Sequence, residues 1–376
     1  MPQRQKKIVQ SSAELLLEYA AGDRDFEAAQ LTAVDLQSAQ LAKVNLSKAV
    51  LFKAVLSKAI LAGANLSKAD LVRANLQFAK LNRSNLHQAN LYEADLTGAS
   101  LGTANLSQAS LESAILSRCD FGLANLQRAN LSRVTAISTG FLQAELMDAV
   151  LFQAIFTSAI FERANLTGAN LTEADLSDAN LHKAILIKAN LHKATLDRAN
   201  LSWANLVETN LEGASLIAAN LEQIDFNHAN LLAADLTTAN LSKANLTKAI
   251  LVAANLSRAN LLAANLTEAN LNRSILSEVD LFGANLKRAN LSEANLESAD
   301  LRETNLLLAD LHRANLSGAN LFGAELKGTN CRGANFAGAK LYGAKLIGAN
   351  LQGAVYDDRT EFHSKFSPIK QGMKQI

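Results

Sequence analysis

The segment "ANLSKANLTKAILVAANL", residues 239–256, places a leucine at every fifth position, with an alanine two residues before each. In an α-helix, a step of five residues turns each leucine by about 140° around the axis, so no apolar face forms. A continuous strand also fails, because an odd period sends successive leucines to opposite faces. The pattern becomes consistent when every five-residue unit contains one turn. The leucine and the earlier alanine then both point inward from a short extended segment.

The same period runs without a break from Leu31 to Tyr356, which at five residues each gives 66 consecutive units. We call the central residue of a unit i; position i−2 is alanine in most units. The pattern predicts a coil of short strands that stacks on itself, with backbone hydrogen bonds from coil to coil. The central residue is leucine except at Phe121, Ala136, Phe141, Phe156, Phe161, Phe226, Cys331, Phe336 and Tyr356.

The units "ANLSK", "ADLTG" and "ANLQG" resemble the A(D/N)LxX consensus of pentapeptide-repeat proteins, and this resemblance covers nearly the whole chain. The "YAAGDRDF" stretch at residues 19–26 is similar to the entry segment of many cyanobacterial members. The resemblance implies an all-β fold, a right-handed quadrilateral parallel β-helix in which four units close one coil. It further implies about 16 coils, near 80 Å in length at about 4.8 Å between stacked strands.

Four units per coil would stack residues that are twenty apart. Phe121, Phe141 and Phe161 would then form an internal aromatic ladder, and Ala136 would lie over Phe156. A small residue over a large one conserves core volume, as close packing requires. Residues 131–143 match the repeat least well, and we expect a distorted coil there.

The two ends of the stack need covering, because open strand edges would otherwise polymerise. Ser11 and Glu14 form a capping-box pattern and Gly22 follows as a stop, which predicts a short helix. Its Leu15, Leu16 and Tyr19 are expected to plug the first coil. The expected segments are residues 1–25 with this helix, 26–356 as the β-helix and 357–376 as a C-terminal tail.

Glycine occupies corner position i+2 in the last eight units before the tail. Because glycine tolerates positive φ, we expect type II turns there. These corners are Gly318, Gly323, Gly328, Gly333, Gly338, Gly343, Gly348 and Gly353.

A formal net charge of +1 indicates neither a nucleic-acid binder nor an acidic mimic of DNA. Residues 31–83 are locally basic, with eight lysines and arginines against two aspartates, a net of +6. No stretch of 18 apolar residues occurs, so we expect no transmembrane helix. The apolar run "ELLLEYAA" is short and contains Glu14 and Glu18, which does not indicate a signal peptide. A cytoplasmic location is therefore expected.

The titratable residues do not converge on a catalytic or metal site. Five of the six histidines fall at scattered outward positions, and His363 belongs to the tail. Asp175 and Asp178 are interpreted as surface charge, and Cys119 and Cys331 as buried free thiols. We expect no catalytic residue, no cofactor and no metal, and hence no enzyme.

Outward aromatic columns are the best candidates for a binding surface. Position i+1 is expected to stack Phe52, Val72 and Tyr92 on one face. It is also expected to stack Leu262, Phe282, Phe322 and Tyr342, interrupted by Arg302, on a second face, which also holds Trp203 at a corner. Exposed aromatics are enriched at protein-interaction hot spots. The alternative is that these side chains only stabilise cross-coil pairs.

The sequence therefore predicts a non-enzymatic scaffold or regulator that presents flat faces to a protein partner of unknown identity. The alternative is a DNA-mimicking modulator of gyrase, as in some pentapeptide-repeat proteins, although those are strongly acidic. No nucleic acid and no membrane are expected as partners. Both a monomer and a side-by-side homodimer remain open.

Overall fold

The hydrogen bonds of a single five-residue unit show how the repeat is held together, because each backbone N–H of the unit has an acceptor. In the computed structural model, the unit centred on Leu71 shows the pattern. Three backbone N–H groups donate to carbonyls of neighbouring coils: Leu71 N to Asn90 O (2.7 Å), Arg73 N to Tyr92 O (2.9 Å) and Asn75 N to Ala54 O (2.9 Å). Ala74 N donates to Leu71 O (3.0 Å) within the unit, and Val72 N donates to the side-chain Oδ1 of Asp70 (3.2 Å). Three of these bonds join neighbouring coils, one closes the turn, and one uses a side chain. All five backbone N–H groups of the unit are therefore hydrogen-bonded, as a largely buried backbone requires.

The Asn or Asp at position i−1 has a definite role in this unit. Its side-chain oxygen accepts from the N–H two residues later, which no backbone carbonyl reaches. Asparagine also uses its amide nitrogen: Asn65 Nδ2 donates to Asn45 Oδ1 at 2.9 Å, and Asn85 Nδ2 to Asn65 Oδ1 at 3.3 Å. The A(N/D)L consensus therefore encodes both the turn and a side-chain ladder between coils.

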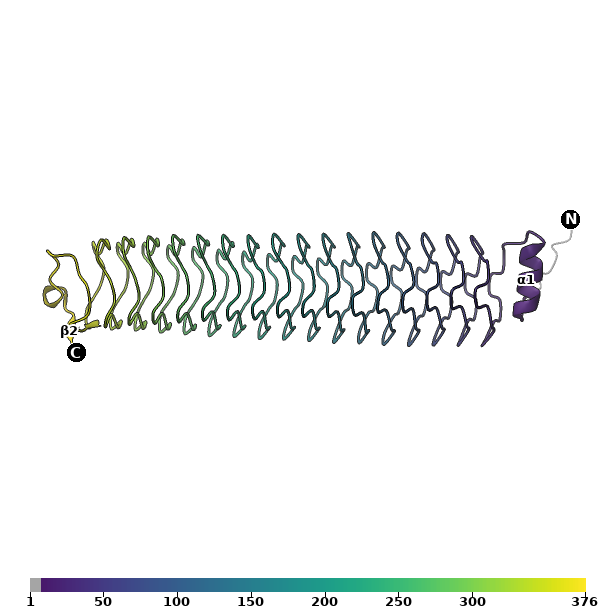
Figure 1. The fold of residues 1–376 in the computed structure, drawn as a ribbon, viewed down its shortest axis with the longest axis horizontal. Coiled ribbons are helices and arrows are strands. Elements are labelled where there is room, and N and C mark those ends of the chain that lie inside the picture. Colours follow the sequence, from purple (N-terminus) through teal and green to yellow (C-terminus); the bar gives the residue numbers. More distant parts are fainter. Residues whose placement is uncertain (1–7) are drawn as a thin grey trace. The chain divides into compact units, whose positions relative to one another are not determined.

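The structure describes residues 8–376, so the first seven residues of the expected N-terminal segment lie outside it. The chain divides into two compact units, which we call unit 1 (to Ile185) and unit 2 (from Leu186). In each unit, residues twenty apart pair as parallel bridges, such as Val50 with Asp70 and Asn240 with Asn260. Similar turns therefore stack within each unit (Figure 1). The expected four-sided parallel architecture is confirmed.

The leucine and alanine positions form the core in both units, since almost all are at most 1 % exposed. The aromatic ladder in unit 1 is confirmed: the ring centroids of Phe121 and Phe141 are 5.1 Å apart, and those of Phe141 and Phe161 are 4.6 Å apart. Phe156 packs edge-on against Phe141 and Phe161. The Ala136 N–H donates to Ile155 O, which places Ala136 on the coil before Phe156.

The expectation of a distorted coil at residues 131–143 is wrong. Bridges continue through it, from Thr135 to Ile155 and from Gly140 to Ile160. The turn bond from Thr139 N to Ala136 O is missing, but the Thr139 hydroxyl donates to Leu116 O at 2.7 Å. A buried threonine thus replaces alanine at i−2 without disturbing the coil.

Helix α1, Ser12–Ala20, lies over the first coil of unit 1 (Figure 1). Ser11 Oγ accepts from Glu14 N at 3.2 Å, which is the predicted cap. Leu15 is fully buried, and the Tyr19 hydroxyl donates to Ala42 O at 2.9 Å. The expectation for Leu16 is wrong, because this side chain is 39 % exposed. Residues four apart share a helix face, so Leu15 and Tyr19 face the coil while Leu16 is turned about 100° away.

The C-terminal tail extends the stack of unit 2 irregularly. Strand β1, Val355–Tyr356, pairs in parallel with β2, Lys374–Gln375, and a 3-10 helix, η1 (Ile369–Gln371), precedes β2. Glu361 bridges to Lys340, twenty-one residues earlier, whereas Lys374 pairs with Val355, nineteen residues earlier. The tail has therefore lost the twenty-residue register of the repeat.

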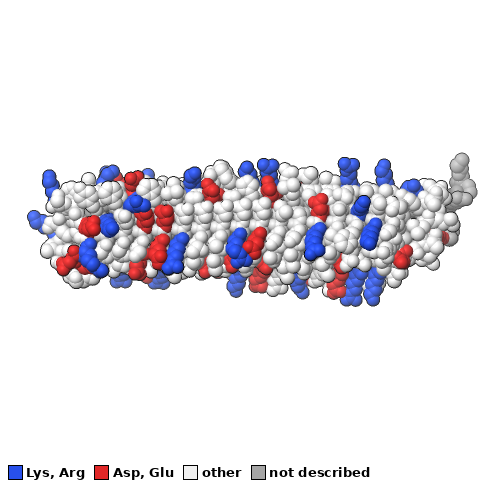
Figure 2. Space-filling view, in the orientation of Figure 1, with Lys and Arg blue, Asp and Glu red and all other residues white. Residues whose placement is uncertain are grey.

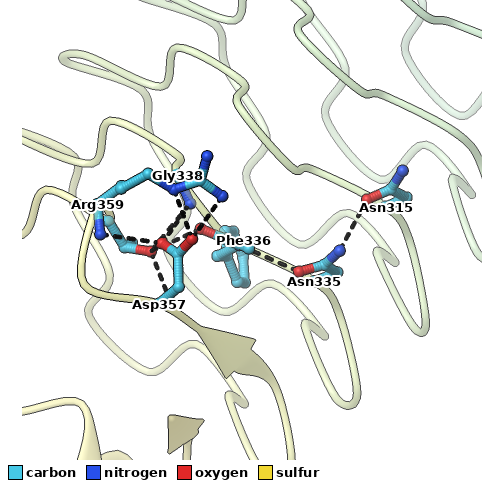
Figure 3. A network of polar contacts seen from close by, with 8 residues as sticks. Asn315, Asn335, Phe336, Gly338, Asp357 and Arg359 are labelled. Atoms are coloured by element: carbon cyan, nitrogen blue, oxygen red, sulfur yellow. Dashed lines mark hydrogen bonds and ion pairs between the residues drawn. The ribbon is translucent and has the colours of Figure 1, made fainter. Parts of the chain in front are cut away.

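Asp357 fastens the start of the tail. In the repeat, a corner N–H donates to a carbonyl nineteen residues later, as Gly318 N does to Ala337 O. Gly338 N instead donates to the side-chain Oδ1 of Asp357 at 2.7 Å (Figure 3). Arg359 Nε donates to Asp357 Oδ2 at 2.8 Å, and the Thr360 hydroxyl also contacts this carboxylate. A carboxylate thus replaces a backbone acceptor at the point where the repeat ends.

This arrangement predicts a low-pH transition in the tail. Desolvation raises the pKa of Asp357, but hydrogen bonds from Arg359, Gly338 and Thr360 outweigh it and lower the pKa from 3.8 to about 2. Because the folded pKa lies below the unfolded value, the stabilising effect is complete above about pH 4 and is lost as the pH falls through about 2. The Gly338 amide NMR shift should therefore titrate with a midpoint near pH 2, and should stay flat in Asp357→Asn. A midpoint near 3.8 would contradict the stabilising role assigned to the hydrogen bonds of the Asp357 carboxylate.

Candidate interaction surfaces

The unit 2 column comprises Leu262, Phe282, Arg302, Phe322 and Tyr342, all at position i+1. Backbone hydrogen bonds place these residues on consecutive coils. The carbonyls of Phe282, Arg302, Phe322 and Tyr342 accept from Ala263, Gly283, Glu303 and Gly323 at 2.9, 3.0, 2.9 and 3.3 Å, respectively. The predicted stacking of this column is therefore present in the backbone register.

Side-chain contacts make the unit 2 column more continuous than the sequence indicates. The rings of Phe322 and Tyr342 stack at 6.1 Å between centroids. Arg302 does not interrupt the column, because its guanidinium lies 5.2 Å from the Phe282 ring centroid. Asp300 holds this guanidinium with Nε–Oδ1 and Nη2–Oδ2 distances of 2.8 and 2.6 Å. The hydrogen bond from Arg302 lowers the pKa of Asp300 despite partial burial, so this pair stays charged.

The tail adds one ring to this column. His363 stacks on Tyr342 with 6.3 Å between ring centroids. His363 could be assigned only to the tail from the sequence, because it lies twenty-one residues after Tyr342 and falls outside the repeat. The register shift at Glu361 brings it into line. A twenty-residue periodicity therefore had no means of finding it.

The outer residues of the unit 2 column are well exposed. Phe322 is 47 % and Tyr342 57 % exposed, and Leu262 is 36 % exposed. Trp203 lies on the same side, three coils before Leu262, as the bonds from Trp203 to Glu222, Gln223 to Ser242 and Lys243 to Leu262 show. It is 52 % exposed at a corner with φ +62°. Glu222, Gln223, Ser242 and Lys243 lie between Trp203 and Leu262, so the apolar strip of unit 2 runs from Leu262 to Tyr342 and does not include Trp203.

The candidate column in unit 1 is less accessible. Phe52, Val72 and Tyr92 lie on consecutive coils, since Lys53 N donates to Val72 O and Arg73 N to Tyr92 O, both at 2.9 Å. All three side chains are half-buried. Lys53 Nζ covers the Phe52 ring at 5.2 Å. A hydrogen bond with Glu93 raises the pKa of Tyr92. The three side chains of this column are therefore less exposed than Phe322 and Tyr342 of the unit 2 column.

Two further exposed apolar side chains lie at corners. Phe78 is 56 % and Leu308 50 % exposed. Each covers a glycine on the next coil: a Cβ on Gly98 would come within 2.6 Å of the Phe78 ring, and one on Gly328 within 2.9 Å of Leu308 Cδ2. This pairing was not predicted, although a large apolar corner residue followed by a glycine twenty residues later indicates it in the sequence.

Charges of both signs are interspersed on the face shown in Figure 2. The basic residues of 31–83 are partly neutralised by acidic residues beyond that range. Lys48 pairs with Glu27 at 2.7 Å, and Arg73 with Glu93 at 2.5 Å. Exposed pairs of this kind add little to the stability of the fold, because water and salt screen them. They nevertheless reduce the positive field that the sequence implied for this region.

The described residues, 8–376, contain no group of three or more His, Cys, Asp or Glu side chains placed to hold a metal ion. They also contain no helix long and apolar enough to cross a membrane. Cys119 and Cys331 are both buried free thiols, as expected. Burial raises the pKa of each to about 12, which leaves them un-ionised at neutral pH.

Five-residue turns that stack every twenty residues around a leucine–alanine core define a four-sided β-solenoid repeat protein. The chain belongs to the pentapeptide-repeat family, whose members fold as right-handed quadrilateral β-helices. The family model, pentapeptide repeats (8 copies), matches residues 29–67, 69–108, 104–136, 144–182, 174–213, 214–251, 249–288, 280–318, 289–328 and 314–353.

Solved structures of cyanobacterial pentapeptide-repeat proteins are similar to this chain. HetL, from the cyanobacterium Nostoc sp. strain PCC 7120 and involved in heterocyst differentiation regulation, is 33 % identical over 57 % of this chain and 91 % of its own, with a TM-score of 0.32. Rfr23 from the cyanobacterium Cyanothece 51142 is 40 % identical over 29 % of this chain and 63 % of its own, with a TM-score of 0.17.

A third solved structure is that of QnrB1, a plasmid-mediated fluoroquinolone resistance protein. It is 18 % identical over 64 % of this chain and 91 % of its own, with a TM-score of 0.20. No curated protein matches the chain. The resemblance to the pentapeptide-repeat family seen in the sequence is confirmed.

Proposed function

We propose that this protein is a non-enzymatic interaction scaffold or regulator whose partner-binding surface is the unit 2 column. The supporting observation is the column from Leu262 to Tyr342, in which Leu262, Phe322 and Tyr342 are exposed and Phe282 is half-buried, and which His363 continues into the tail. Isolated exposed apolar residues are common, but contiguous ones mark interaction sites. Three features stay predictions: a stack of about 16 coils, a cytoplasmic location, and the choice between a monomer and a side-by-side homodimer.

The chemistry of the column suits a flat protein partner. Aromatic rings on a β-helix face lose little conformational freedom on binding, because the coils already fix their backbones. Arg302 adds a planar group over Phe282, and its charge is balanced by Asp300. Aromatic and arginine side chains at the centre of an interface supply most hot spots. The partner is therefore expected to bring apolar side chains rather than a strong opposite charge.

The double variant Phe282→Glu/Phe322→Glu should retain the fold and abolish partner capture. Both side chains point outward, so charging them leaves the core intact but places carboxylates in the proposed interface. The measurement is affinity capture from a lysate of the native host, wild type beside the variant, with proteins identified by mass spectrometry. Thermal unfolding of both proteins checks that the fold is unchanged.

The matched control is Ile217→Glu/Leu308→Glu, which also charges two exposed apolar residues of unit 2, but away from the column. A partner retained by wild type and by this control, but lost by the column variant, supports the proposal. If the column variant captures the same partners as wild type, the column is not the binding surface. Equal loss in both variants would point to a general charge effect and would also contradict it.

The alternative, a DNA-mimicking modulator of gyrase, requires a strongly acidic surface. Here the formal net charge is +1 and both signs are interspersed (Figure 2). No observation on this chain favours the alternative. A gyrase supercoiling assay is therefore expected to show no inhibition by this protein. Inhibition would support the DNA-mimic alternative.

A further inference from the structure

The tail covers the last coil of unit 2 on some sides but not on all. It supplies acceptors to Leu341 N, from Glu361 O at 2.7 Å, and to Gly353 N, from Gly372 O at 2.8 Å. Asp357 Oδ1 serves Gly338 N in the same way. Between these points lies the segment 344–349, which we call the open edge. Its neighbours in the tail, residues 363–371, have left the register of the repeat.

The open edge presents unpaired backbone groups in a defined order. One coil earlier, Leu326 N donates to Lys345 O, Gly328 N donates to Ile347 O, and Ala324 O accepts from Lys345 N. Within the described part of the chain, the equivalent groups of the last coil, namely Leu346 N, Gly348 N and Ala344 O, have no such partner. These groups form the hydrogen-bonding pattern that a further parallel strand would complete.

Apolar surface lies beside these groups. Leu346 is a central residue of the repeat, yet it is half-buried, whereas nearly all other central leucines are at most 3 % exposed. Ile347 is 72 % exposed. Together with Phe366, His363, Lys365 and Gln371 of the tail, these residues line an open hollow of about 370 Å³. The hollow therefore combines an unpaired strand edge with an incompletely covered core residue.

The positive charge around the hollow favours an acidic ligand. Residues 326–376 contain eight basic and three acidic residues, a net of +5. Lys365 and Lys370, on the tail beside the edge, have no ion-pair partner among the described residues. Lysines at a strand edge oppose pairing with an identical, equally basic edge. They favour instead an extended chain that carries carboxylates.

We propose that the open edge binds an extended acidic–apolar peptide segment of a partner protein, which adds as one more parallel strand. In the repeat, the residue that bonds Ala324 O and Leu326 N is Lys345, at an outward position, and Leu346 follows it inward. The peptide should therefore place an acidic residue outward, a leucine inward over Leu346, and a small residue before both. Ala-Asp-Leu-Glu satisfies these demands. This site is separate from the unit 2 column and does not depend on it.

The test uses a fluorescein-labelled, end-blocked peptide, Gly-Ser-Ala-Asp-Leu-Glu-Ser-Gly, with fluorescence anisotropy on the full-length protein. Wild type should bind it, and Leu346→Glu should weaken binding by about tenfold or more. Lys365→Glu/Lys370→Glu should weaken it severalfold and reduce its salt dependence. Lys243→Glu, an exposed charge reversal elsewhere in unit 2, should change nothing. A peptide with lysines in place of the two acidic residues should not bind.

Amide hydrogen exchange separates strand addition from simple charge attraction. Bound peptide should slow exchange at Leu346 and Gly348, the two donors it covers. Absence of peptide binding, equal binding by Leu346→Glu, or unchanged exchange at both amides would overturn the proposal. So would sedimentation showing a dimer that Leu346→Glu converts to a monomer, because a second copy would then occupy the edge. Phe282→Glu/Phe322→Glu should bind the peptide normally, so this test and that of the proposed function can fail separately.

Discussion

Phe141→Ala should lower the free energy of unfolding by about 3–5 kcal/mol, among the largest losses expected from a single substitution in this protein. The Phe141 ring is fully buried and touches three others: it stacks on Phe121 and Phe161 and meets the edge of Phe156. Truncation removes all three ring contacts at once. The rigid coils on either side cannot collapse into the space, because their spacing is fixed by backbone hydrogen bonds. Guanidinium unfolding followed by circular dichroism measures the change.

The matched control is Phe141→Leu, since leucine is the usual central residue of the repeat. It keeps most of the volume and should cost only about 1 kcal/mol. Comparable losses in the two variants would mean that ring stacking, rather than filled volume, stabilises this part of unit 1. A loss of less than about 1 kcal/mol for Phe141→Ala would contradict the tightly packed core altogether.

Substitutions at corner Ala253 should change stability in opposite directions. Ala253 has φ +56°, and its N–H donates to Asn272 O at 3.0 Å. Proline cannot adopt this φ and has no N–H, so Ala253→Pro should cost about 3 kcal/mol or more. Glycine adopts positive φ freely, and Ala253→Gly should stabilise unit 2 by about 0.5–1 kcal/mol.

Ala337→Gly provides the control for Ala253→Gly. Ala337 occupies position i+1, where φ is not positive, so glycine brings only its entropic cost and should destabilise by about 0.5–1 kcal/mol. Thermal unfolding of the three variants gives the order directly. If Ala253→Gly and Ala337→Gly shift the melting temperature in the same direction, strain at the corner is not what sets its glycine preference.

The positive φ expected at the eight C-terminal glycine corners is present, but the prediction from sequence was incomplete. Glycine at eight corners predicted type II turns near the C-terminal end, yet all 66 corners from Ala28 to Gly353 have positive φ, and 53 of them are not glycine. Lysine, arginine and even Trp203 adopt this conformation. The buried leucine, the turn bond and the bonds to the next coil together impose it, so tertiary structure overrides local preference.

The core was predictable because it depends only on period. A step of five residues fixed the inward positions, and a step of twenty brought Phe121, Phe141 and Phe161 together. The role of asparagine at i−1 was present in the same pattern but was not recognised. Recognising this role requires a count of the backbone donors in one unit. Such a count shows that the N–H at i+1 has no backbone acceptor.

The candidate surfaces were only partly predictable. Coil register placed Phe282, Phe322 and Tyr342 in one column, and the structure agrees. The position of Arg302 over Phe282 depends on a side-chain rotamer held by Asp300, which no periodicity specifies. His363 and the open edge depend on the tail, where spacings of twenty-one and nineteen replace twenty. Whether these surfaces bind a partner stays a prediction.

The twenty-residue stacking also limits how the gene for such a chain can change in length. Deleting twenty residues within unit 2, such as 284–303, would remove one coil and bring Phe322 next to Phe282 on the same face. Deleting five residues at the same place would rotate everything beyond it by a quarter turn, and Phe322 and Tyr342 would move to the neighbouring face. Both deletions preserve the repeat and its core. Only the first preserves a surface, so insertions and deletions tolerated during evolution should come in multiples of twenty wherever a face is under selection.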